Sequence, residues 1–406
     1  MNIMPLLRKR LADPLLHIWV SVFLEVIGFS MLFPFLPRFL LDLGASLPMI
    51  GFYISINAFI GFFSGIVWGR LSDRFGRRPI LIICRIGAIA GYIMLALSTN
   101  LALLLAARVI DGIFSRSVPL TLTAVGDIVH PERRSKEMSK IGIAWIVGGL
   151  IGPAVGVLLS AKGLLAIGLF CAALSLAALI ISLLTLKESK PQDAVGGTAD
   201  KTTQPAKQAV FSLGLMRQHN PAILLGQNFF VFLAHFIFNT TITLYITRQL
   251  GLSIAQIGSM FTAIGAINLL GRVTLFPKVL DKLRDRKTYI LGVMIYLAAF
   301  VWLMAATRLW EFMAITAMVS FGTSCSLDVM NGIMSKTVRR QEMGEMMGMN
   351  SAVESIGLIL GPMIGSYLLG LPNVAFYGLA AVASTLTALM IGRLHLRPVE
   401  EEATRV

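Results

Sequence analysis

Ionisable side chains stand inside long apolar runs of this sequence, where each carries an energetic cost. They are Glu25, Arg85, Arg108, Asp111, Arg116, His235, Asp328 and Glu354. An ionisable group near the middle of a bilayer costs roughly 2.5–3.5 kcal/mol on insertion scales, so such residues are candidates for function. A carboxyl group in apolar surroundings without a nearby base can bind and release a proton near neutral pH. These residues therefore indicate proton or cation binding within a membrane.

Glu25 is the principal candidate among these residues. It lies in the segment LEVIGFSMLFPFLP, a third to half-way along its apolar run, with no cation close to it in sequence. We expect Glu25 to bind a proton or a cationic substrate, and Arg108 to tune Glu25 or Asp111. A structural salt bridge is the equal alternative for Arg85 and Asp328.

Two further ionisable residues belong to the candidate proton or substrate site. Glu354 lies about one helical turn before Gly357, which begins a glycine- and proline-containing motif, and His235 lies in a long apolar segment. A polar residue of this kind either lines a cavity or makes a hydrogen bond between helices.

A short basic segment, GRLSDRFGRRP, separates two apolar runs and forms the second chemical motif. Its residues are Gly69, Asp73, Arg74, Gly76, Arg77 and Arg78, within Gly69–Pro79. Glycine permits a tight turn and a close approach of helices. The single acid stands among four arginines, so we expect Asp73 to be held by ion pairs in a surface loop.

A Gly-x-x-x-Gly-Pro-x-x-Gly element occurs twice. Gly148, Gly152, Pro153 and Gly156 return as Gly357, Gly361, Pro362 and Gly365. Small residues at four-residue spacing allow helix backbones to pack closely, and the proline removes a helical hydrogen bond and bends the span. The recurrence predicts a duplicated unit, with the basic loop Arg272–Lys287 as the counterpart of the loop Gly69–Pro79.

The surrounding composition predicts the elements that position these residues. Apolar residues make up 56% of the 406 residues and charged ones 14%, against about 25% charged in soluble domains. Runs of about 20 apolar residues cross a bilayer as helices, because backbone polar groups in lipid must pair within their own segment. The predicted spans are about His17–Leu40, Pro48–Trp68, Ile80–Leu97, Leu101–Val129, Ile141–Ser160, Leu164–Leu186, Ala222–Ile246, Ile254–Leu275, Thr288–Ala306, Glu311–Met334, Met346–Leu369 and Val374–Ile391.

The predicted fold is all-α, with twelve transmembrane helices in two pseudo-symmetric six-helix bundles. The bundles cover residues 1–186 and 221–393, joined by a polar linker over 187–220 and followed by a tail over 394–406. Most of the 35 Lys and Arg residues fall at one end of the spans, against Arg38, Lys162, Arg248 and Arg308 at the other. This positive-inside bias predicts a multi-pass protein of the cell membrane with both termini in the cytoplasm.

These motifs together resemble the major facilitator superfamily, over the whole chain. The loop motif matches that family's signature between spans two and three. Arg108 and Gly112, with Asp111 between them, match its Arg-x-x-x-Gly element, and Gly148–Gly156 resembles the antiporter motif of its drug:proton exporters. Gly28, Pro34 and Pro37 match the first span of the same branch. The resemblance implies a cytoplasmic latch in which Asp73 contacts Arg77, Asp127 and the start of span eleven.

The function expected from the resemblance is proton-coupled efflux of small hydrophobic or amphipathic compounds by alternating access. The same fold carrying a sugar, nucleoside or lipid by symport or antiport is the alternative, and a sensor or scaffold without transport is a distant one. We expect the partners to be a small molecule, protons and the bilayer, and the protein to be a monomer. The net charge of +14 lies in loops, not in a patch interleaved with aromatics, so nucleic acid is not expected.

Sequence signals for an enzyme or a bound cofactor are missing. There is no GxxxxGK[ST], HExxH, GxSxG or CxxC. Cys84, Cys171 and Cys325 all fall in apolar runs, without the spacing of a disulfide framework or a metal site. We therefore expect a transporter that needs no cofactor or metal and draws its energy from an ion gradient.

Overall fold

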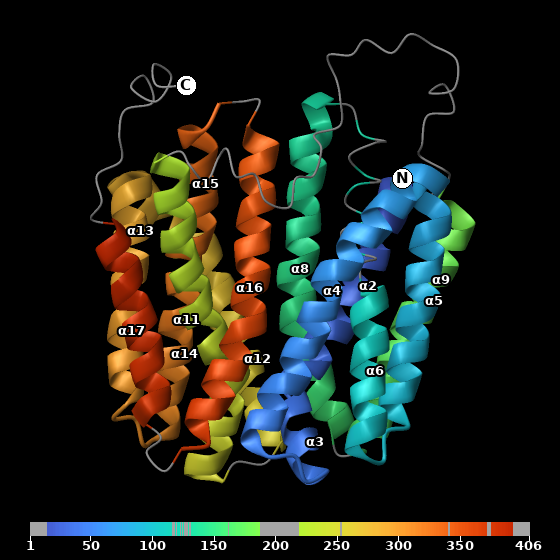
Figure 1. The fold of residues 1–406 in the computed structure, drawn as a ribbon, viewed down its shortest axis with the longest axis horizontal. Helices are drawn as coiled ribbons and strands as arrows, with labels where there is room; N and C mark the ends of the chain where they lie inside the picture. The colour runs from blue at the N-terminus through green and yellow to red at the C-terminus, as the bar shows by residue number, and fades with distance from the viewer. Residues whose placement is uncertain are drawn as a thin grey trace, which may run out of the picture. The chain divides into compact units, whose positions relative to one another are not determined.

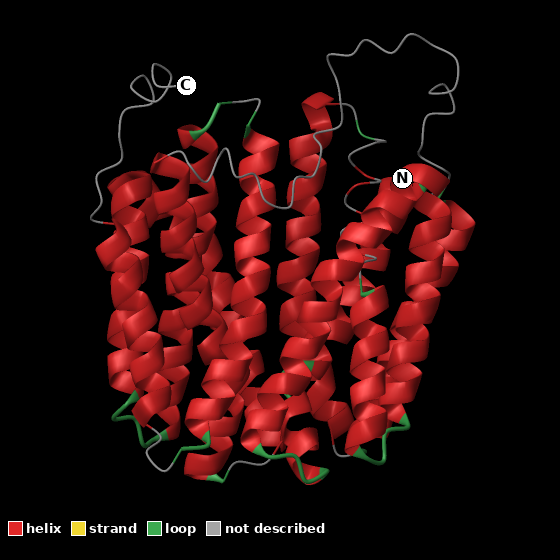
Figure 2. Cartoon of the chain, in the orientation of Figure 1, coloured by secondary structure: helices red, strands yellow, loops and turns green. Residues whose placement is uncertain are grey.

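A computed structural model describes residues 14–392, apart from 116–117, 119, 122, 124, 126–128, 130, 161, 187–218, 252–253, 340–341 and 372–374. Every regular element in this part of the chain is helical, as Figure 2 shows. Eight of the described helical segments are long and apolar enough to cross a membrane, and two shorter apolar helices accompany them. The all-helical membrane fold is thus confirmed, while the count of twelve spans stays a prediction.

The helices of the N-terminal half overlap the predicted runs, although α4 and α8 extend beyond them and α6 ends earlier (Figure 1). They are α2 (Pro14–Leu32), α3 (Leu36–Asp42), α4 (Leu47–Phe75), α5 (Arg77–Ala96), α6 (Leu101–Phe114), α8 (Pro131–Ser160) and α9 (Gly163–Thr185). The predicted first span is divided, because a turn over Phe33–Phe35 separates α2 from α3. Pro34 and Pro37 lack backbone N–H donors, so a continuous helix would lose hydrogen bonds there.

The C-terminal half has corresponding helices and two π-helical turns. They are α11 (His219–Leu250), α12 (Ile254–Leu270), η2 (Gly271–Leu275), α13 (Phe276–Leu303), α14 (Leu309–Thr323), η3 (Ser324–Asp328), α15 (Val329–Thr337), α16 (Met343–Leu369) and α17 (Ala375–Gly392). The prediction of a loop over Arg272–Lys287 is wrong. These residues are helical except for a break at Arg284, with φ 60° and ψ 172°. Non-glycine residues rarely adopt this conformation.

Two compact units form within the chain. One comprises Met1–Ala45, Ile56–Ala199 and Ser253–Thr262, and the other comprises Ser46–Ser55, Asp200–Leu252 and Ala263–Val406. In the first unit, α2 packs against α8 and α9, and α5 packs against α6 and α9. In the second, α11 packs against α16 and α17, and α13 packs against α14 and α17. The order of packing is therefore repeated. The predicted linker lies outside the described residues up to Gln218, as does the predicted tail.

The repeated glycine motif performs the same packing role in both units. A Cβ atom on Gly152 of α8 would lie 2.8 Å from the backbone oxygen of Ile27 in α2. A Cβ atom on Gly361 of α16 would lie 2.9 Å from the backbone carbon of Phe236 in α11. Such distances are too short for any side chain, so glycine is what lets these backbones touch. Pro153 and Pro362 lie inside α8 and α16 respectively.

Candidate functional site

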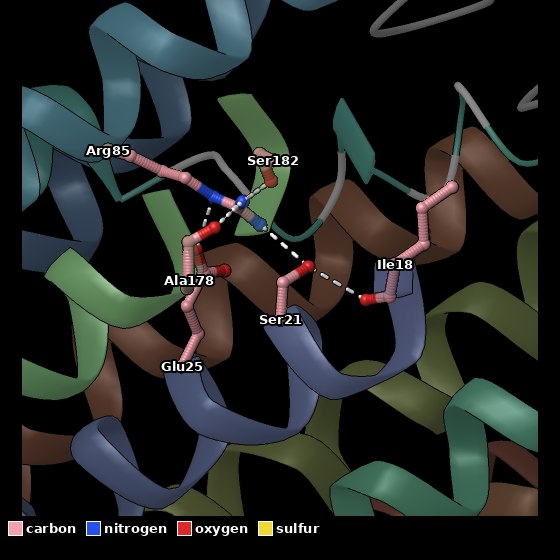
Figure 3. Close-up of polar contacts among 6 residues, drawn as sticks. All are labelled: Ile18, Ser21, Glu25, Arg85, Ala178 and Ser182. Carbon is pink, nitrogen blue, oxygen red and sulfur yellow. Dashed lines mark hydrogen bonds and ion pairs between the residues drawn. The ribbon is translucent and has the colours of Figure 1, made fainter. Parts of the chain in front are cut away.

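A buried ion pair joins two helices in the interior of the first unit. The Nε atom of Arg85 in α5 lies 2.8 Å from Oε1 of Glu25 in α2, and the two side chains are 1% and 9% exposed. Figure 3 shows both side chains pointing toward one another between α2, α5 and α9. No cation lies close to Glu25 in sequence, and the packing of α5 on α2 supplies one that is 60 residues away in the chain.

Neutral groups complete the surroundings of the Arg85 guanidinium. Its Nη1 donates to the backbone oxygen of Ala178, at 2.6 Å, and to the hydroxyl of Ser182, and its Nη2 donates to Ser21 at 3.0 Å (Figure 3). The Ser21 hydroxyl in turn donates to the backbone oxygen of Ile18. Arg85 thus binds one carboxylate and three neutral acceptors from two neighbouring helices.

The helical period places Ser21 and Glu25 on one face of α2, because residues four apart lie on the same side. A second face carries an apolar groove. A cavity of about 250 Å³ lies between α2 and α8, and its described lining is entirely apolar: Leu16, Trp19, Val20, Phe23, Ile143, Ala144 and Val147. Two aromatic side chains in an apolar groove suit a hydrophobic or amphipathic ligand. One helix therefore carries a titratable pair on one face and this α2–α8 groove on another.

Arg108 and Asp111 of α6 form a separate buried pair, with Nη1 and Oδ2 2.8 Å apart. The side-chain nitrogen of Asn57 in α4 also donates to Oδ2 of Asp111, at 2.8 Å. Gly112 lies against α4, since a Cβ there would approach the Asn57 oxygen to 2.9 Å. The structure does not bring Arg108 to Glu25 by any contact that it records. Arg116 lies outside the described residues.

A polar cluster in the second unit surrounds His235 of α11. Its Nδ1 lies 2.9 Å from the hydroxyl of Tyr296 in α13, which lies 2.7 Å from the hydroxyl of Thr323 in α14. Asn239, one turn along α11, lies 2.9 Å from Nε2 of His235. The cluster ties three helices together by hydrogen bonds, one of the two alternatives expected for His235.

Asp328 and Glu354 lie in different surroundings. Asp328 ends η3 and pairs with Arg272 in η2, with Oδ2 and Nη2 2.5 Å apart. A π-helical turn often marks a functional position, and here two such turns contribute the two partners. Glu354 is an exposed residue of α16, and no ion pair joins it to any residue that the structure describes. The residues predicted to bind protons or substrate therefore do not form one cluster among the described residues.

The basic segment Gly69–Pro79 is more helical than predicted. Helix α4 continues to Phe75 and α5 begins at Arg77, so only Gly76 interrupts them, with φ 103° and ψ 156°. This positive φ is a conformation that glycine adopts without strain. The loop expected over Gly69–Pro79 is therefore a one-residue break.

The predicted ion pair within this segment is present. Oδ1 of Asp73 lies 2.5 Å from Nη1 of Arg77, which also donates to Ser72 at 2.7 Å. Arg78 donates to the backbone oxygen of Leu183 in α9 at 2.9 Å, and Arg74 lies over the ring of Phe75. Asp127, the other expected partner of Asp73, lies outside the described residues.

Several polar residues of these sites were not predicted. Ser21 stands one turn before Glu25, and that spacing was a usable signal, whereas Ser182 is one of many small residues in α9. Tyr296 and Thr323 stand in helices distant in sequence from His235, so only the packing of α11 against α13 and α14 identifies them.

Apolar helices long enough to cross a membrane, with repeated packing and buried charge, make this a polytopic membrane protein, and the family that it matches is one of transporters and not of enzymes. The sequence model of the Major Facilitator Superfamily matches residues 18–226 and 224–405. The chain belongs to this superfamily.

Proteins similar to this chain include two kinds of resistance protein. The tetracycline resistance protein of class C from Escherichia coli is 25% identical over 387 residues, which cover 91% of this chain and 92% of that protein. Multidrug resistance protein 2 from Bacillus subtilis (strain 168) is 24% identical over 356 residues, covering 86% and 87%.

The fold of this chain is also found in solved structures of several different transporters. A D-xylose-proton symporter matches with a TM-score of 0.73 at 18% identity, covering 96% of this chain and 98% of that one. A bacterial homolog to the human lysosomal transporter Spinster matches with a TM-score of 0.73 at 15% identity, covering 93% and 94%. At these identities the likeness concerns the fold alone.

Proposed function

We propose that this protein is a proton-coupled exporter of small hydrophobic or amphipathic compounds that works by alternating access. The observation that carries the proposal is that α2 has a different kind of site on each of two faces. Glu25 faces Arg85 on one, while Trp19 and Phe23 line the α2–α8 groove on the other. Named relatives that are tetracycline and multidrug resistance proteins support the same substrate class.

The Glu25–Arg85 pair is buried, so breaking it carries an energetic cost. Removing one partner of a buried ion pair typically costs about 3–5 kcal/mol, because the other charge is left without compensation. The Arg85 guanidinium keeps three neutral acceptors when Glu25 binds a proton. Protonation would therefore weaken the link between α2 and α5, while Arg85 would keep its three neutral hydrogen-bond acceptors.

Proton binding and substrate binding are coupled in this proposal because Glu25 and the α2–α8 groove are both on helix α2. When the Glu25 carboxylate takes up a proton, α2 loses its charge-assisted contact with α5 and can shift against α8. That shift changes the groove lined by Trp19 and Phe23, so an apolar compound binds differently in the two protonation states. Release of the proton restores the ion pair. No covalent step is involved, and the proton moves only between water and the Glu25 carboxylate.

The topology belongs to the same proposal. We place both termini in the cytoplasm of a cell-membrane protein that acts as a monomer. The alternative solutes are a sugar, a nucleoside or a lipid, because the fold is also that of a D-xylose-proton symporter. The apolar lining of the α2–α8 groove favours the hydrophobic class, since sugar sites require several hydrogen-bonding groups.

The test is proton flux across liposomes that contain the purified full chain. An imposed pH gradient should drive uptake of an amphipathic dye or of tetracycline, with a matching pH change inside. Glu25→Gln should abolish that change, whereas Asp42→Asn, which alters an exposed carboxylate at the end of α3, should leave it intact. Transport of sugars or nucleosides in place of these compounds, or substrate flux without proton movement, would disprove the proposal.

A further inference from the structure

The basic end of the second unit contains a cavity that the proposed transport cycle does not use. It has a volume of about 240 Å³ and lies between α11, α13, α15 and α17. Its walls are apolar, with Leu224, Ile290, Met330 and Ile333 among them, while Arg286, Lys336 and Tyr289 add polar groups. An apolar cavity with a few polar groups at one end is suited to an amphipathic ligand.

A buried hydroxyl group gives this cavity an unsatisfied donor. Tyr289 lines it and is 3% exposed, yet its hydroxyl has no hydrogen-bond partner among the described residues. Leaving such a group unpaired costs about 1–3 kcal/mol. A ligand oxygen that accepts this hydrogen bond would remove the cost, so the site favours a ligand with acceptor oxygens.

The charges around the cavity favour an anion. Arg286 is exposed, and Lys336 donates to Asp285, so these three lining residues leave one positive charge in excess. The adjoining part of α13 has four more exposed cations and one exposed acid, which are Lys278, Lys282, Arg284 and Lys287, and Asp281. A basic group close to an anionic lipid head group attracts it by about 1 kcal/mol, and this attraction falls off within about 10 Å, so the cations that line the cavity contribute most.

An apolar strip extends from the cavity along the outside of the bundle. Ile290, Met294 and Val301 of α13, together with Leu379, Leu386 and Met390 of α17, are 43% to 69% exposed. These two helices pack against one another. The distance from Ile290 to Val301 is about 16 Å at about 1.5 Å per residue, close to one leaflet of a hydrocarbon core of about 30 Å. The strip thus has the length of an acyl chain.

We propose that this cavity binds the head group of an anionic phospholipid, whose acyl chains lie along the α13–α17 strip. The phosphate accepts a hydrogen bond from Tyr289 and faces Arg286 and Lys336, and the chains cover the exposed apolar residues. A soluble phosphate would satisfy the cavity but would leave the strip unused. This site is independent of the drug or proton specificity proposed above, because it needs only the membrane location that the family shows.

The test is native mass spectrometry of the purified full chain, titrated with dioleoyl phosphatidylglycerol or dioleoyl phosphatidylcholine. We expect preferential retention of phosphatidylglycerol, and about a fivefold weaker apparent affinity in Arg286→Ala. Tyr289→Phe should weaken it by a comparable factor while conserving charge. The matched control is Lys278→Ala, which removes a cation from the same helix outside the cavity and should change the affinity less than twofold. Gel filtration confirms that each variant is folded.

Two outcomes would overturn the proposal. Equal losses in Arg286→Ala and Lys278→Ala would show diffuse attraction between a basic surface and any anionic lipid. Displacement of bound phosphatidylglycerol by millimolar inorganic phosphate or glycerol phosphate, reduced in Arg286→Ala, would show a phosphate site with no role for the acyl chains. Failure of both soluble anions to displace the lipid is the expected result.

Discussion

The Glu25 carboxylate of α2 and the Arg85 guanidinium of α5 form a buried ion pair, with Oε1 and Nε 2.8 Å apart. The neutral acceptors Ser21, Ser182 and Ala178 hold the same guanidinium. This relationship distinguishes two roles for Glu25. A purely structural pair stabilises the fold at every stage of transport, whereas a coupling pair must open when Glu25 binds a proton.

A comparison of the single variant Glu25→Gln with the double variant Glu25→Gln, Arg85→Gln distinguishes these two roles. We expect the single variant to lower the free energy of unfolding, by less than the 3–5 kcal/mol typical of a broken buried pair, because three neutral acceptors remain. The double variant removes the uncompensated charge, so it should recover part of the stability. Thermal unfolding measures this recovery, and proton flux measures coupling. If the double variant also regains proton-coupled transport, Glu25 is structural and not a proton carrier.

The packing of α8 on α2 gives a prediction with a control in the same helix. A Cβ atom on Gly152 would lie 2.8 Å from both the Ile27 oxygen and the Met31 nitrogen, and it would also collide with the Ser30 hydroxyl, which donates to Gly148. We expect Gly152→Ala to destabilise the protein by about 1–3 kcal/mol, as overpacking does.

Gly149→Ala is the matched control, because nothing lies within 4 Å of a Cβ atom at that position. Alanine favours the helix by up to about 1 kcal/mol over glycine, so this variant should be neutral or slightly more stable. Thermal unfolding in detergent compares the two. Equal effects of the two substitutions would show that the close approach of α8 to α2 does not contribute to stability.

The sequence predicted the helical membrane architecture and the glycine packing because both depend on local composition and period. It did not predict the partner of Glu25, because Arg85 reaches it only through the rotation of α5 against α2. The same applies to Tyr296 and Thr323 beside His235. The segment near Asp73 was taken for a loop because of its charge, yet charged residues continue a helix readily where it leaves the apolar layer, and only Gly76 interrupts it.

Phe23→Ala tests whether the α2–α8 groove binds substrate. Phe23 lines this groove, and removing its ring takes away apolar contact with a bound compound. We expect weaker binding of a hydrophobic dye, measured by equilibrium fluorescence titration, and some loss of thermal stability, because Phe23 also packs against the core of the first unit. Phe29→Ala is the matched control, since Phe29 is an exposed residue of the same helix outside the groove. Equal losses of affinity in both variants would exclude the groove as the substrate site.

Asp73→Asn tests the proposed latch. Asp73 and Arg77 lie 2.5 Å apart, with side chains 65% and 17% exposed, and a surface pair with an exposed carboxylate contributes about 0–1 kcal/mol to stability. The folded state should therefore be nearly as stable in the variant. We expect slower turnover with unchanged affinity at equilibrium, because a latch acts on the rate of interconversion and does not contact substrate. Asp42→Asn is the control, since Asp42 forms a similar pair with Arg38 at 3.1 Å outside the motif. A large loss of affinity in Asp73→Asn, or an equal slowing in Asp42→Asn, would contradict the latch.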